Sequence, residues 1–333
     1  MKKNTELLIS PSLFTLFVFL LINKNLCKAD YILLDRIPKS VVKNLRGEGA
    51  KVIYIHSGDS IGNSLFSKVL RIIIRNFEHV RLWWIYKGEY EYPHVYGNDE
   101  IISSVPFRKF GITVIEDGSF NLQSKDFFEA RVKKMHKYIF TRLMYKNIYS
   151  YIPYGYNNLV RKIILTHEKA INSEINHKVE KVCLKSLWNY KTEAERSKIQ
   201  NIFGITSNLV NSLNNYPTVL LTQPLGKSEG GFMTEKEKIS IYSNLLKGSS
   251  SNSLLIKTHY AEKTNYRKYF TNSLIVDQPI PFQFFELFNY HPSKVITISS
   301  SAALKYKNEN CEIIFTGTEI DKRIVEMYGI VRL

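Results

Sequence analysis

Ten residues near the end of the chain, Val295–Leu304, read VITISSSAAL. The first four are apolar or β-branched, which is typical of a buried strand, and the last three favour a helix. Three serines stand between the two. In an open parallel sheet, ligands bind beyond the carboxyl ends of the strands. This stretch therefore predicts a strand, a turn and a helix, with the serines at a ligand-binding edge.

Short apolar runs separated by helical stretches recur along the rest of the chain. In the back half, strands are predicted at Val219–Thr222, Leu254–Lys257, Leu274–Val276, Val295–Ile298 and Ile313–Phe315, with helices at Glu235–Leu246, Phe282–Tyr290 and Ser301–Lys307. In the front half, strands are predicted at Leu7–Ser10, Tyr31–Leu34, Val52–Ile55, Leu82–Tyr86 and Ile112–Ile115, with helices at Leu13–Asn23, Leu65–Phe77 and, rich in basic residues, Lys125–Lys146. Strands that alternate with helices in two blocks predict an α/β protein with two doubly wound, Rossmann-like domains. We expect a front domain at residues 1–212, with a basic helical insertion, and a back domain at 213–333.

The first thirty residues have two interpretations. Lys2 and Lys3 precede an apolar run at Leu13–Ile22, as in a signal peptide. That run is shorter than the ~20 residues of a membrane span, Glu6 and Pro11 interrupt its approach, and no A-x-A cleavage site follows. We favour the other interpretation, in which a strand, a proline turn and a buried helix open a parallel sheet.

Composition limits the partners. The chain has 333 residues, 44% of them hydrophobic, and a formal net charge of +16. Such a charge attracts polyanions, and the basic residues are densest between Arg131 and Lys185, where they form either a solvated helical face or a patch for an anionic membrane. No nucleic-acid module is recognisable, so nucleic acid is not an expected partner. Three cysteines without a CxxC pair indicate neither a zinc site nor a disulfide framework, and they suit the cytoplasm, including the inner face of the plasma membrane.

Polar clusters follow three predicted strands: Glu116–Ser119 (EDGS), Lys257–His259 (KTH) and the serines of VITISSSAAL. A carboxylate at a strand end can take a proton, and a histidine beside a lysine can act on a phosphate. Serine hydroxyls and backbone amides at a helix start can bind that phosphate. No two aspartates lie two positions apart, so the D-x-D ligands of metal-bridged diphosphate chemistry are missing. The set suits metal-independent transfer of a sugar from a nucleotide donor.

Four short stretches carry a resemblance to a known family: IEDGSFNL (Ile115–Leu122), VLLTQP (Val219–Pro224), LIKTHY (Leu255–Tyr260) and ITISSSAAL (Ile296–Leu304). In this order they resemble the bacterial sialyltransferases with a GT-B fold, and their amino-acid sequences are most similar to glycosyltransferase family 52. The resemblance implies the GT-B arrangement, in which two Rossmann-like domains face each other across a cleft. The chain departs from the usual pattern at Tyr260, where a proline commonly follows the histidine.

The resemblance also implies roles for individual residues. Asp117 would be the general base, with Glu116 as its neighbour or substitute, and His259 the general acid on the CMP phosphate. The remaining donor-binding residues would be Lys257, Ser299, Ser300 and Ser301 at the phosphate and Glu286 at the ribose hydroxyls. Glu229 is a second candidate for the base, and Ser57, Gly58 and Asp59 are candidates for the acceptor side.

The expected function is an inverting sialyltransferase. It would move sialic acid from CMP-sialic acid to a terminal sugar, with galactose favoured, of lipooligosaccharide or capsular polysaccharide, with neither a cofactor nor a metal. The family resemblance also implies a homodimer. Two alternatives stay open, namely a family 52 enzyme that uses another nucleotide sugar such as a UDP-hexose, and a non-catalytic basic protein that binds membranes or polyanions.

Overall fold

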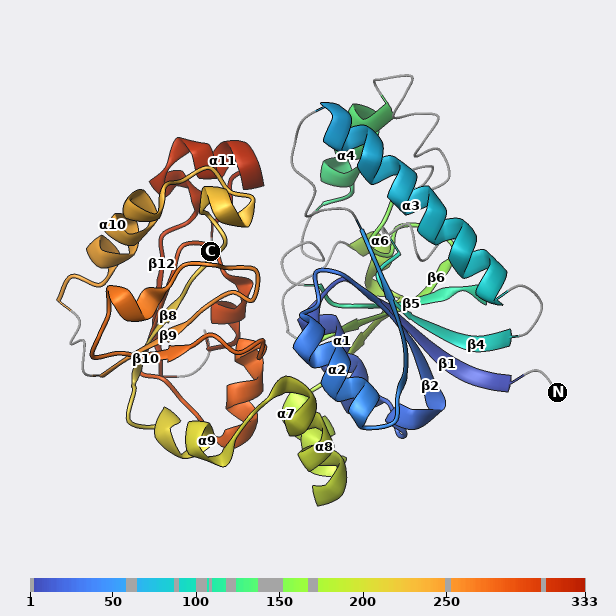
Figure 1. Cartoon of the computed structure of the whole chain (residues 1–333), viewed down its shortest axis with the longest axis horizontal. Coiled ribbons are helices and arrows are strands. Elements are labelled where there is room, and N and C mark those ends of the chain that lie inside the picture. The colour runs from blue at the N-terminus through green and yellow to red at the C-terminus, as the bar shows by residue number, and fades with distance from the viewer. Residues whose placement is uncertain are drawn as a thin grey trace. The chain divides into compact units, whose positions relative to one another are not determined.

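The computed structural model describes residues 3–57, 65–86, 90–99, 107, 110–117, 124–136, 152–166, 173–248, 253–306 and 310–332. The chain divides into two compact units, Met1–Ile202 (unit 1) and Phe203–Leu333 (unit 2), which are blue to green and yellow to red in Figure 1. We had expected the boundary after residue 212, whereas the helix α9 (Ser207–Leu213) falls within unit 2. No helix in the described part of the chain is both long and apolar enough to span a bilayer.

Unit 1 is built on a parallel sheet of strand order β3-β2-β1-β4-β5-β6-β7. Its strands are β1 (Lys3–Ser10), β2 (Ala29–Leu34), β3 (Lys51–Ile55), β4 (Tyr90–Gly97), β5 (Ile112–Ile115), β6 (Val160–Leu165) and β7 (Val179–Lys181). Successive strands run outward from β1 in one direction and then from β4 in the other. A ligand-binding crevice is expected at the carboxyl ends of these two strands.

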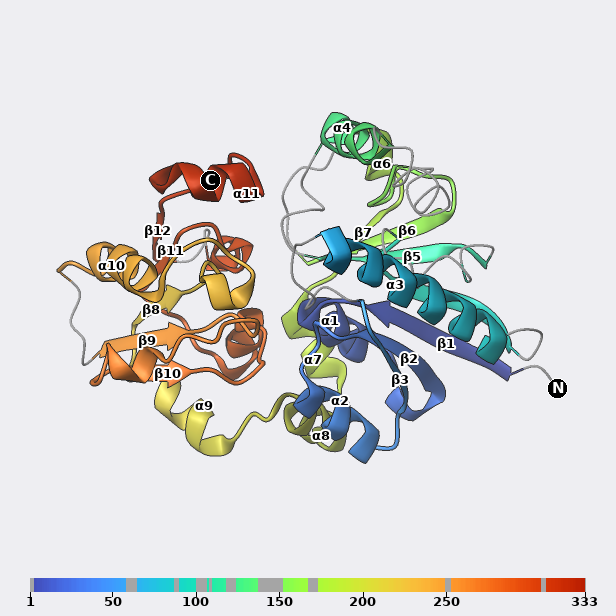
Figure 2. The same cartoon turned by 45° about the horizontal axis from the view of Figure 1, so that its top comes forward.

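The helices of unit 1 cover this sheet, and α3 lies along it in both views (Figure 1, Figure 2). They are α1 (Leu13–Ile22), η1 (Leu26–Lys28), α2 (Lys39–Gly47), α3 (Leu65–Tyr86), α4 (Lys125–His136), α6 (Ser173–Asn176), α7 (Leu184–Tyr190) and α8 (Glu193–Phe203). The sequence of α1 is apolar on every side, and its side chains are buried from Thr15 to Leu21. The Ser12 hydroxyl caps its first turn. The predicted strand, turn and helix at the start of the chain are therefore confirmed.

In unit 1 one predicted strand is wrong, and a strand beside β1 was missed. Leu82–Tyr86 is the end of α3 rather than a strand, because Glu78 and Leu82 continue the buried face of that helix into its aromatic last turn. The missed strand is β4, which pairs with β1 on the side away from β2 and contains Pro93. A proline cannot donate to a sheet ladder, and the register shifts at this point, where Asn4 pairs with Glu91 and Glu6 with His94. The predicted basic helix is present as far as His136, and its remainder at 137–146 lies outside the described residues.

Unit 2 repeats the plan with a parallel sheet of order β10-β9-β8-β11-β12. The strands are β8 (Thr218–Leu221), β9 (Leu254–Lys257), β10 (Leu274–Val276), β11 (Lys294–Thr297) and β12 (Glu312–Phe315), all close to the predicted ranges. Its α-helices are α9, α10 (Glu235–Leu245) and α11 (Lys322–Tyr328). Short 3-10 turns are η4 (Lys227–Glu229), η6 (Tyr266–Lys268) and η9 (Thr318–Ile320). Two parallel, doubly wound units confirm the predicted α/β class with two Rossmann-like domains. The crevice expected in unit 2 lies at the carboxyl ends of β8 and β11.

Two of the helices predicted in unit 2 have a different form. Phe282–Phe288 (η7) and Ser301–Tyr306 (η8) are 3-10 helices. A six-residue 3-10 helix provides little of the dipole that makes an α-helix N-terminus attract anions. Any phosphate contact at Ser299–Ser301 would therefore rest mainly on hydroxyl and amide groups rather than on a helix terminus.

Candidate active site

Glu116 and Asp117 follow β5 at the carboxyl edge of unit 1, but their side chains have different surroundings. The Glu116 carboxylate is buried and accepts hydrogen bonds from the backbone N–H and the hydroxyl of Thr166, at 2.7 and 2.8 Å. Its carbonyl oxygen accepts from the Thr15 hydroxyl at 3.0 Å. Glu116 thus ties the end of β5 to the end of β6 and to α1, which is a structural task.

Asp117 is partly exposed and lies next to the expected crevice. Its Oδ2 accepts a hydrogen bond from the side-chain amide of Asn98 at 3.3 Å, and Asn98 itself follows β4. Burial raises the pKa of Asp117, while hydrogen bonds from Ser12 and Asn98 and the charge of Arg36 lower it in part. A carboxylate with a raised pKa is a stronger base than a solvated one. The rest of the predicted cluster, Gly118 and Ser119, lies outside the described residues.

The acceptor-side candidates in unit 1 are only partly described. Ser57 is buried, and its hydroxyl donates to Asp35 Oδ1 at 2.5 Å while its carbonyl oxygen accepts from Arg75. These contacts fasten the end of β3 to the segments after β2 and within α3. Gly58 and Asp59 lie outside the described residues.

Lys257 ends β9 in unit 2 and is buried. Its Nζ donates to the carbonyl oxygens of Thr258, at 2.6 Å, and of Gln278, at 3.2 Å. Burial lowers the pKa of Lys257 to about 8, although nearby carboxylates oppose the shift. The side chain therefore fastens the loop after β9 to the loop after β10, and its positive charge also acts on His259.

His259 lies two residues beyond β9, and its ring is held from two sides. Its Nδ1 accepts a hydrogen bond from the backbone N–H of Ala261 at 3.2 Å, and the ring stacks on Tyr260 with centroids 4.3 Å apart. Burial and the charge of Lys257 lower the pKa of His259 to about 4. The imidazole is neutral at pH 7, and because Nδ1 is an acceptor, Nε2 carries the proton.

The predicted serines follow β11, the neighbour of β8. The Ser299 hydroxyl donates to the side-chain carbonyl of Gln223, which follows β8, at 2.9 Å. The backbone N–H of Ser300 donates to Thr297 Oγ1 at 3.1 Å, and Ser299–Ser301 are all partly exposed. Because Thr222 N–H also bonds the Lys257 carbonyl oxygen at 3.2 Å, the ends of β8, β9 and β11 meet at one edge.

Glu286 comes from η7, which packs against the η8 helix that begins at Ser301. It is 8% exposed, and its Oε2 lies 3.3 Å from the ammonium of Lys305 in η8, in a geometry that is not that of a hydrogen bond. A buried carboxylate oxygen without a hydrogen bond can accept one from a ligand hydroxyl. The structure thus places Lys257, His259, Glu286 and the three serines within unit 2, and Asp117 and Glu116 within unit 1.

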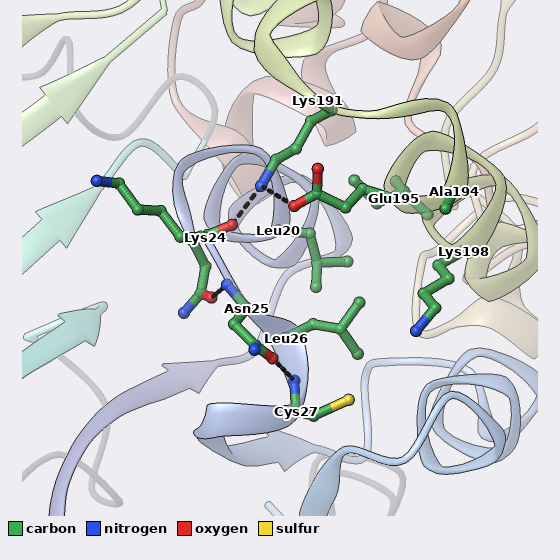
Figure 3. A pocket seen from close by; sticks show the side chains of 11 residues that line it. Leu20, Lys24, Asn25, Leu26, Cys27, Lys191, Ala194, Glu195 and Lys198 are labelled. Carbon is green, nitrogen blue, oxygen red and sulfur yellow. Dashed lines mark hydrogen bonds and ion pairs between the residues drawn. The ribbon is translucent and has the colours of Figure 1, made fainter.

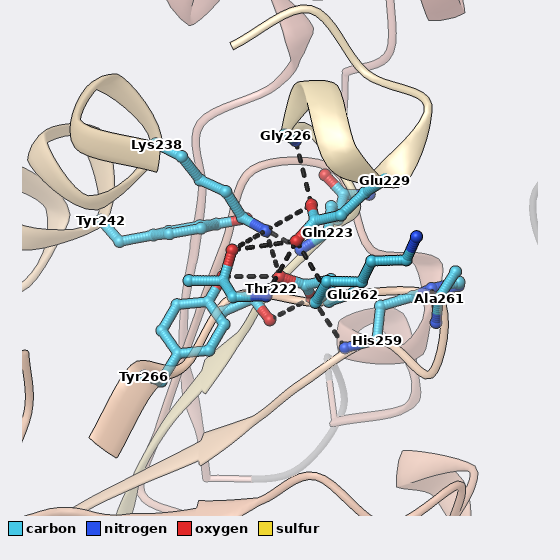
Figure 4. A network of polar contacts seen from close by, with 12 residues as sticks. Thr222, Gln223, Gly226, Glu229, Lys238, Tyr242, His259, Ala261, Glu262 and Tyr266 are labelled. Atoms are coloured by element: carbon cyan, nitrogen blue, oxygen red, sulfur yellow. Dashed lines mark hydrogen bonds and ion pairs between the residues drawn. The ribbon is translucent and has the colours of Figure 1, made fainter. Parts of the chain in front are cut away.

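Sequence analysis did not predict the buried charge cluster that lies beside this edge (Figure 4). The Lys238 ammonium from α10 lies 2.7 Å from Glu229 Oε2 and 2.5 Å from Glu262 Oε2, and all three side chains are at most 1% exposed. Burial would raise the pKa of Glu229, but hydrogen bonds from Lys238 and from backbone amides outweigh it, and the pKa is lowered. Glu229 is therefore a structural anion, which argues against its use as the base. The one visible signal was Lys238 itself, four residues before Tyr242 on the buried face of α10.

A cavity of about 220 Å³ lies elsewhere in unit 1, beside the residues that lead into β2 (Figure 3). It is lined by Leu20, Asn23, Lys24, Asn25, Leu26, Cys27, Lys191, Ala194, Glu195, Lys198 and Ile199. Its lining residues between 20 and 27 lead into the amino end of β2, and the others come from the end of α7 and from α8, so the cavity lies away from the strand ends that carry the candidates. Within the described ranges no group of three His, Cys, Asp or Glu side chains is placed to hold a metal ion, and none of the three cysteines forms a disulfide.

Comparison with known proteins identifies the family. The model of glycosyltransferase family 52 matches residues 36–322. An uncharacterized protein of Haemophilus influenzae is 32% identical over 236 residues, which cover 71% of this chain and 72% of that protein. Among solved structures, the α/β-galactoside α-2,3-sialyltransferase of the luminous marine bacterium Photobacterium phosphoreum has a TM-score of 0.57 at 12% identity, covering 100% of this chain and 97% of its own. That likeness supports the GT-B fold, and the family match over most of the chain shows that this protein is a member of glycosyltransferase family 52.

Proposed function

We propose that this family 52 glycosyltransferase is a sialyltransferase, which transfers sialic acid from CMP-sialic acid with inversion and without a metal. The acceptor would be a terminal galactose of lipooligosaccharide or capsular polysaccharide. The observation that carries the proposal is the edge of unit 2, where the neighbouring strands β9, β8 and β11 end and are followed by His259, Gln223 and Ser299. The ring N–H of His259 and the serine hydroxyls are suited to the phosphate of a nucleoside monophosphate, and the buried carboxylate of Glu286 is suited to its ribose.

On this proposal each group has one task in the reaction. The Asp117 carboxylate takes the proton of the acceptor hydroxyl, whose oxygen attacks the anomeric carbon. The bond from that carbon to the phosphate oxygen breaks, and its electron pair leaves with CMP. His259 and the serines Ser299–Ser301 stabilise the departing phosphate, and Glu286 accepts hydrogen bonds from the ribose hydroxyls. Family membership favours this enzyme over a non-catalytic polyanion-binding protein.

Thermal unfolding with nucleotides tests the donor. A ligand that binds only the folded protein at 100 times its Kd adds about 2.7 kcal/mol of stability. CMP should raise the melting temperature of the wild type, and it should do so much less in Glu286→Ala. The outcome that would favour the alternative donor is a shift with UDP that exceeds the shift with CMP.

We also propose that the protein works in the cytoplasm and contacts the anionic inner face of the plasma membrane through α3. This helix has an outward stripe of Phe66, Ile73, Phe77, Val80 and Trp84, whose side chains are 51 to 76% exposed. Apolar and aromatic residues on one side of a helix suit the interface of a bilayer, and the net charge of +16 complements anionic lipid.

Sedimentation with vesicles tests this surface. The wild type should bind phosphatidylglycerol vesicles in low salt, and a Phe77→Ser, Trp84→Ser double variant should not. Equal binding by the two proteins would locate the membrane contact elsewhere. The homodimer that the family resemblance implies is a separate proposal, which sedimentation equilibrium of the lipid-free protein tests.

A further inference from the structure

The carboxyl edge of the unit 1 sheet carries polar side chains well beyond Asp117. Asp117 follows β5, and Asn98, which donates a hydrogen bond to it, follows β4. Ser12 and Arg36, which come after β1 and β2, also act on Asp117, by a hydrogen bond and by charge. Next to β2 lies β3, at the edge of the described sheet, and His56 follows it. The row of polar residues therefore crosses the sheet from β5 to β3.

His56 is exposed to solvent, but its ring and its backbone are held on three sides. Its Nδ1 lies 3.6 Å from Asp35 Oδ2, at ion-pair distance, and the His56 side chain is 61% exposed. The Tyr54 ring meets the imidazole edge to face, with centroids 5.9 Å apart. The backbone N–H of His56 donates to Glu78 Oε1 of α3 at 3.4 Å. His56 is thus an exposed imidazole in a fixed position.

The two carboxylates that hold His56 are themselves anchored. Asp35 Oδ1 accepts a hydrogen bond from the Ser57 hydroxyl at 2.5 Å. Glu78 is buried, and its Oε2 lies 2.8 Å from Nη1 of Arg81. Ser57, which was predicted to lie on the acceptor side, therefore acts on Asp35, and the group that this arrangement presents to solvent is His56.

This arrangement suits the hydroxyls of a sugar. A carboxylate beside Nδ1 favours the proton on that nitrogen, which leaves Nε2 of the neutral ring as a hydrogen-bond acceptor. A sugar hydroxyl can donate to Nε2. Arg36, exposed after the neighbouring strand β2, offers donors to further hydroxyl oxygens. The Tyr54 ring adds an aromatic surface beside the imidazole.

The distance along the edge determines which part of an acceptor can reach His56. Neighbouring strands lie about 4.8 Å apart, so the steps from β5 through β4, β1 and β2 to β3 span about 19 Å. The acceptor hydroxyl that reacts is placed at Asp117, at the other end of the row. A disaccharide bound there is too short to extend to His56, whereas a tetrasaccharide is long enough.

We propose that His56, oriented by Asp35, binds a sugar of an oligosaccharide acceptor that lies two or more residues away from the terminal galactose. His56 then raises the affinity for long acceptors and takes no part in the reaction at Asp117. This proposal rests on the proposed function, because it takes Asp117 as the place where the acceptor hydroxyl reacts. Asp35 is a positioning residue in this subsite.

A matched pair of neutral acceptors tests the proposal with CMP-sialic acid. They are N-acetyllactosamine and lacto-N-neotetraose, a tetrasaccharide that ends in the same disaccharide. His56→Ala should raise KM for the tetrasaccharide about three- to tenfold, the scale of one lost hydrogen bond, and leave KM for the disaccharide and both kcat values unchanged. His177→Ala, exposed before β7 and so at the opposite edge of the sheet, is the matched control and should behave as wild type. Equal changes in KM for the two acceptors, or none, would overturn the proposal.

Asp35→Asn tests the positioning step. The amide oxygen can still accept from the Ser57 hydroxyl, but the charge beside Nδ1 of His56 is gone. KM for the tetrasaccharide should rise, while KM for N-acetyllactosamine and the melting temperature stay close to wild type. An unchanged KM for the tetrasaccharide would refute the role of Asp35. If this variant does not fold, the two KM values of His56→Ala still decide the role of His56.

Saturation-transfer NMR of the full chain with lacto-N-neotetraose reads the contact without any reaction. In the wild type, protons of the two sugars at the reducing end should receive saturation. His56→Ala should lose at least half of that signal and keep the saturation of the terminal galactose. A wild type without saturation at the reducing end, or equal saturation in the two proteins, would overturn the proposal. If the contact is present but no CMP is released from CMP-sialic acid, the proposed donor fails and this subsite stands.

Discussion

Replacing Lys238 with methionine should destabilise unit 2 strongly. The ammonium is fully buried and contacts Glu229, Glu262 and the Thr264 hydroxyl, the last at 3.2 Å. Without it, two buried carboxylates face each other, and at neutral pH one of them has to take up a proton. Moving a glutamate pKa from its ordinary value of 4.5 to above 7 costs about 3.4 kcal/mol at 1.36 kcal/mol per unit. That value lies within the ~3–5 kcal/mol that breaking a buried ion pair costs.

The loss should depend on pH in a defined direction. In the wild type the pKa of Glu229 is lowered, so its stabilising contribution is present above the unfolded value of about 4.5 and is lost as the pH falls through the folded pKa. In Lys238→Met the pKa of a buried carboxylate is raised instead. Its penalty is absent below the unfolded value and grows as the pH rises. The difference between the two proteins should therefore increase from pH 5 to pH 7.5.

Hydrogen exchange measured by mass spectrometry suits this test, because all three tryptophans precede unit 2 and their fluorescence would report on unit 1. Amides of β8 and β9 should exchange a few hundred times faster in the variant at pH 7.5, at tenfold per 1.4 kcal/mol. Amides of β1 and β2 serve as an internal reference, and Lys236→Met, exposed on the same helix, as a matched control. Unchanged exchange in β8 and β9, or a loss independent of pH, would refute the reasoning.

Three further predictions concern the candidate site. Asp117→Ala should lower kcat at least a hundredfold with CMP-sialic acid, on the ~10²–10⁴ scale of acid–base catalysis, with the Kd of CMP nearly unchanged; near-normal turnover would exclude Asp117 as the base. Asn98→Ala removes a hydrogen bond that lowers the pKa of Asp117, so the acid limb of the kcat–pH profile should move to higher pH, and an unmoved limb would show that Asn98 does not act on the base. His259 has a folded pKa of about 4 against 6.5 for the free side chain, so the folded state should lose stability as the pH falls from about 6.5 towards 4. His259→Gln should flatten this limb in urea titrations, whereas an unchanged slope would mean that the His259 ring is not the cause.

The alternation of strands and helices was sufficient to predict most of the sheet in each unit. Apolar runs such as Leu254–Lys257 and Val295–Ile298 are strands, because parallel strands that are covered on both faces are uniformly apolar. The strands that escaped prediction lack that pattern. β4 contains Pro93, β6 has exposed charges at Arg161 and Lys162, and β7 has only three residues. These strands depend on partners far away in the sequence.

The candidate site was predictable where it follows a strand and not where it depends on tertiary packing. The positions of Asp117, His259 and Ser299 at strand ends were predicted, because each follows an apolar run that forms a parallel strand of its own unit, and their roles stay predictions. The amide of Asn98 and the carboxylate of Glu262 were not predicted. Their contacts with Asp117 and with Lys238 join segments that are distant in the sequence, and no local pattern signals such contacts. Glu116 precedes Asp117 directly and was predicted as its neighbour or substitute in the site. Its side chain instead accepts a hydrogen bond from Thr166, which the sequence pattern does not reveal.

The most direct measurement of the proposed function is the release of CMP from CMP-sialic acid by the purified protein, with and without lactose, in buffer that contains EDTA. We expect lactose-dependent CMP release, with an equal amount of sialyl-lactose formed. The absence of CMP release with either mixture, together with release of UDP from a UDP-hexose, would contradict the assignment of the donor.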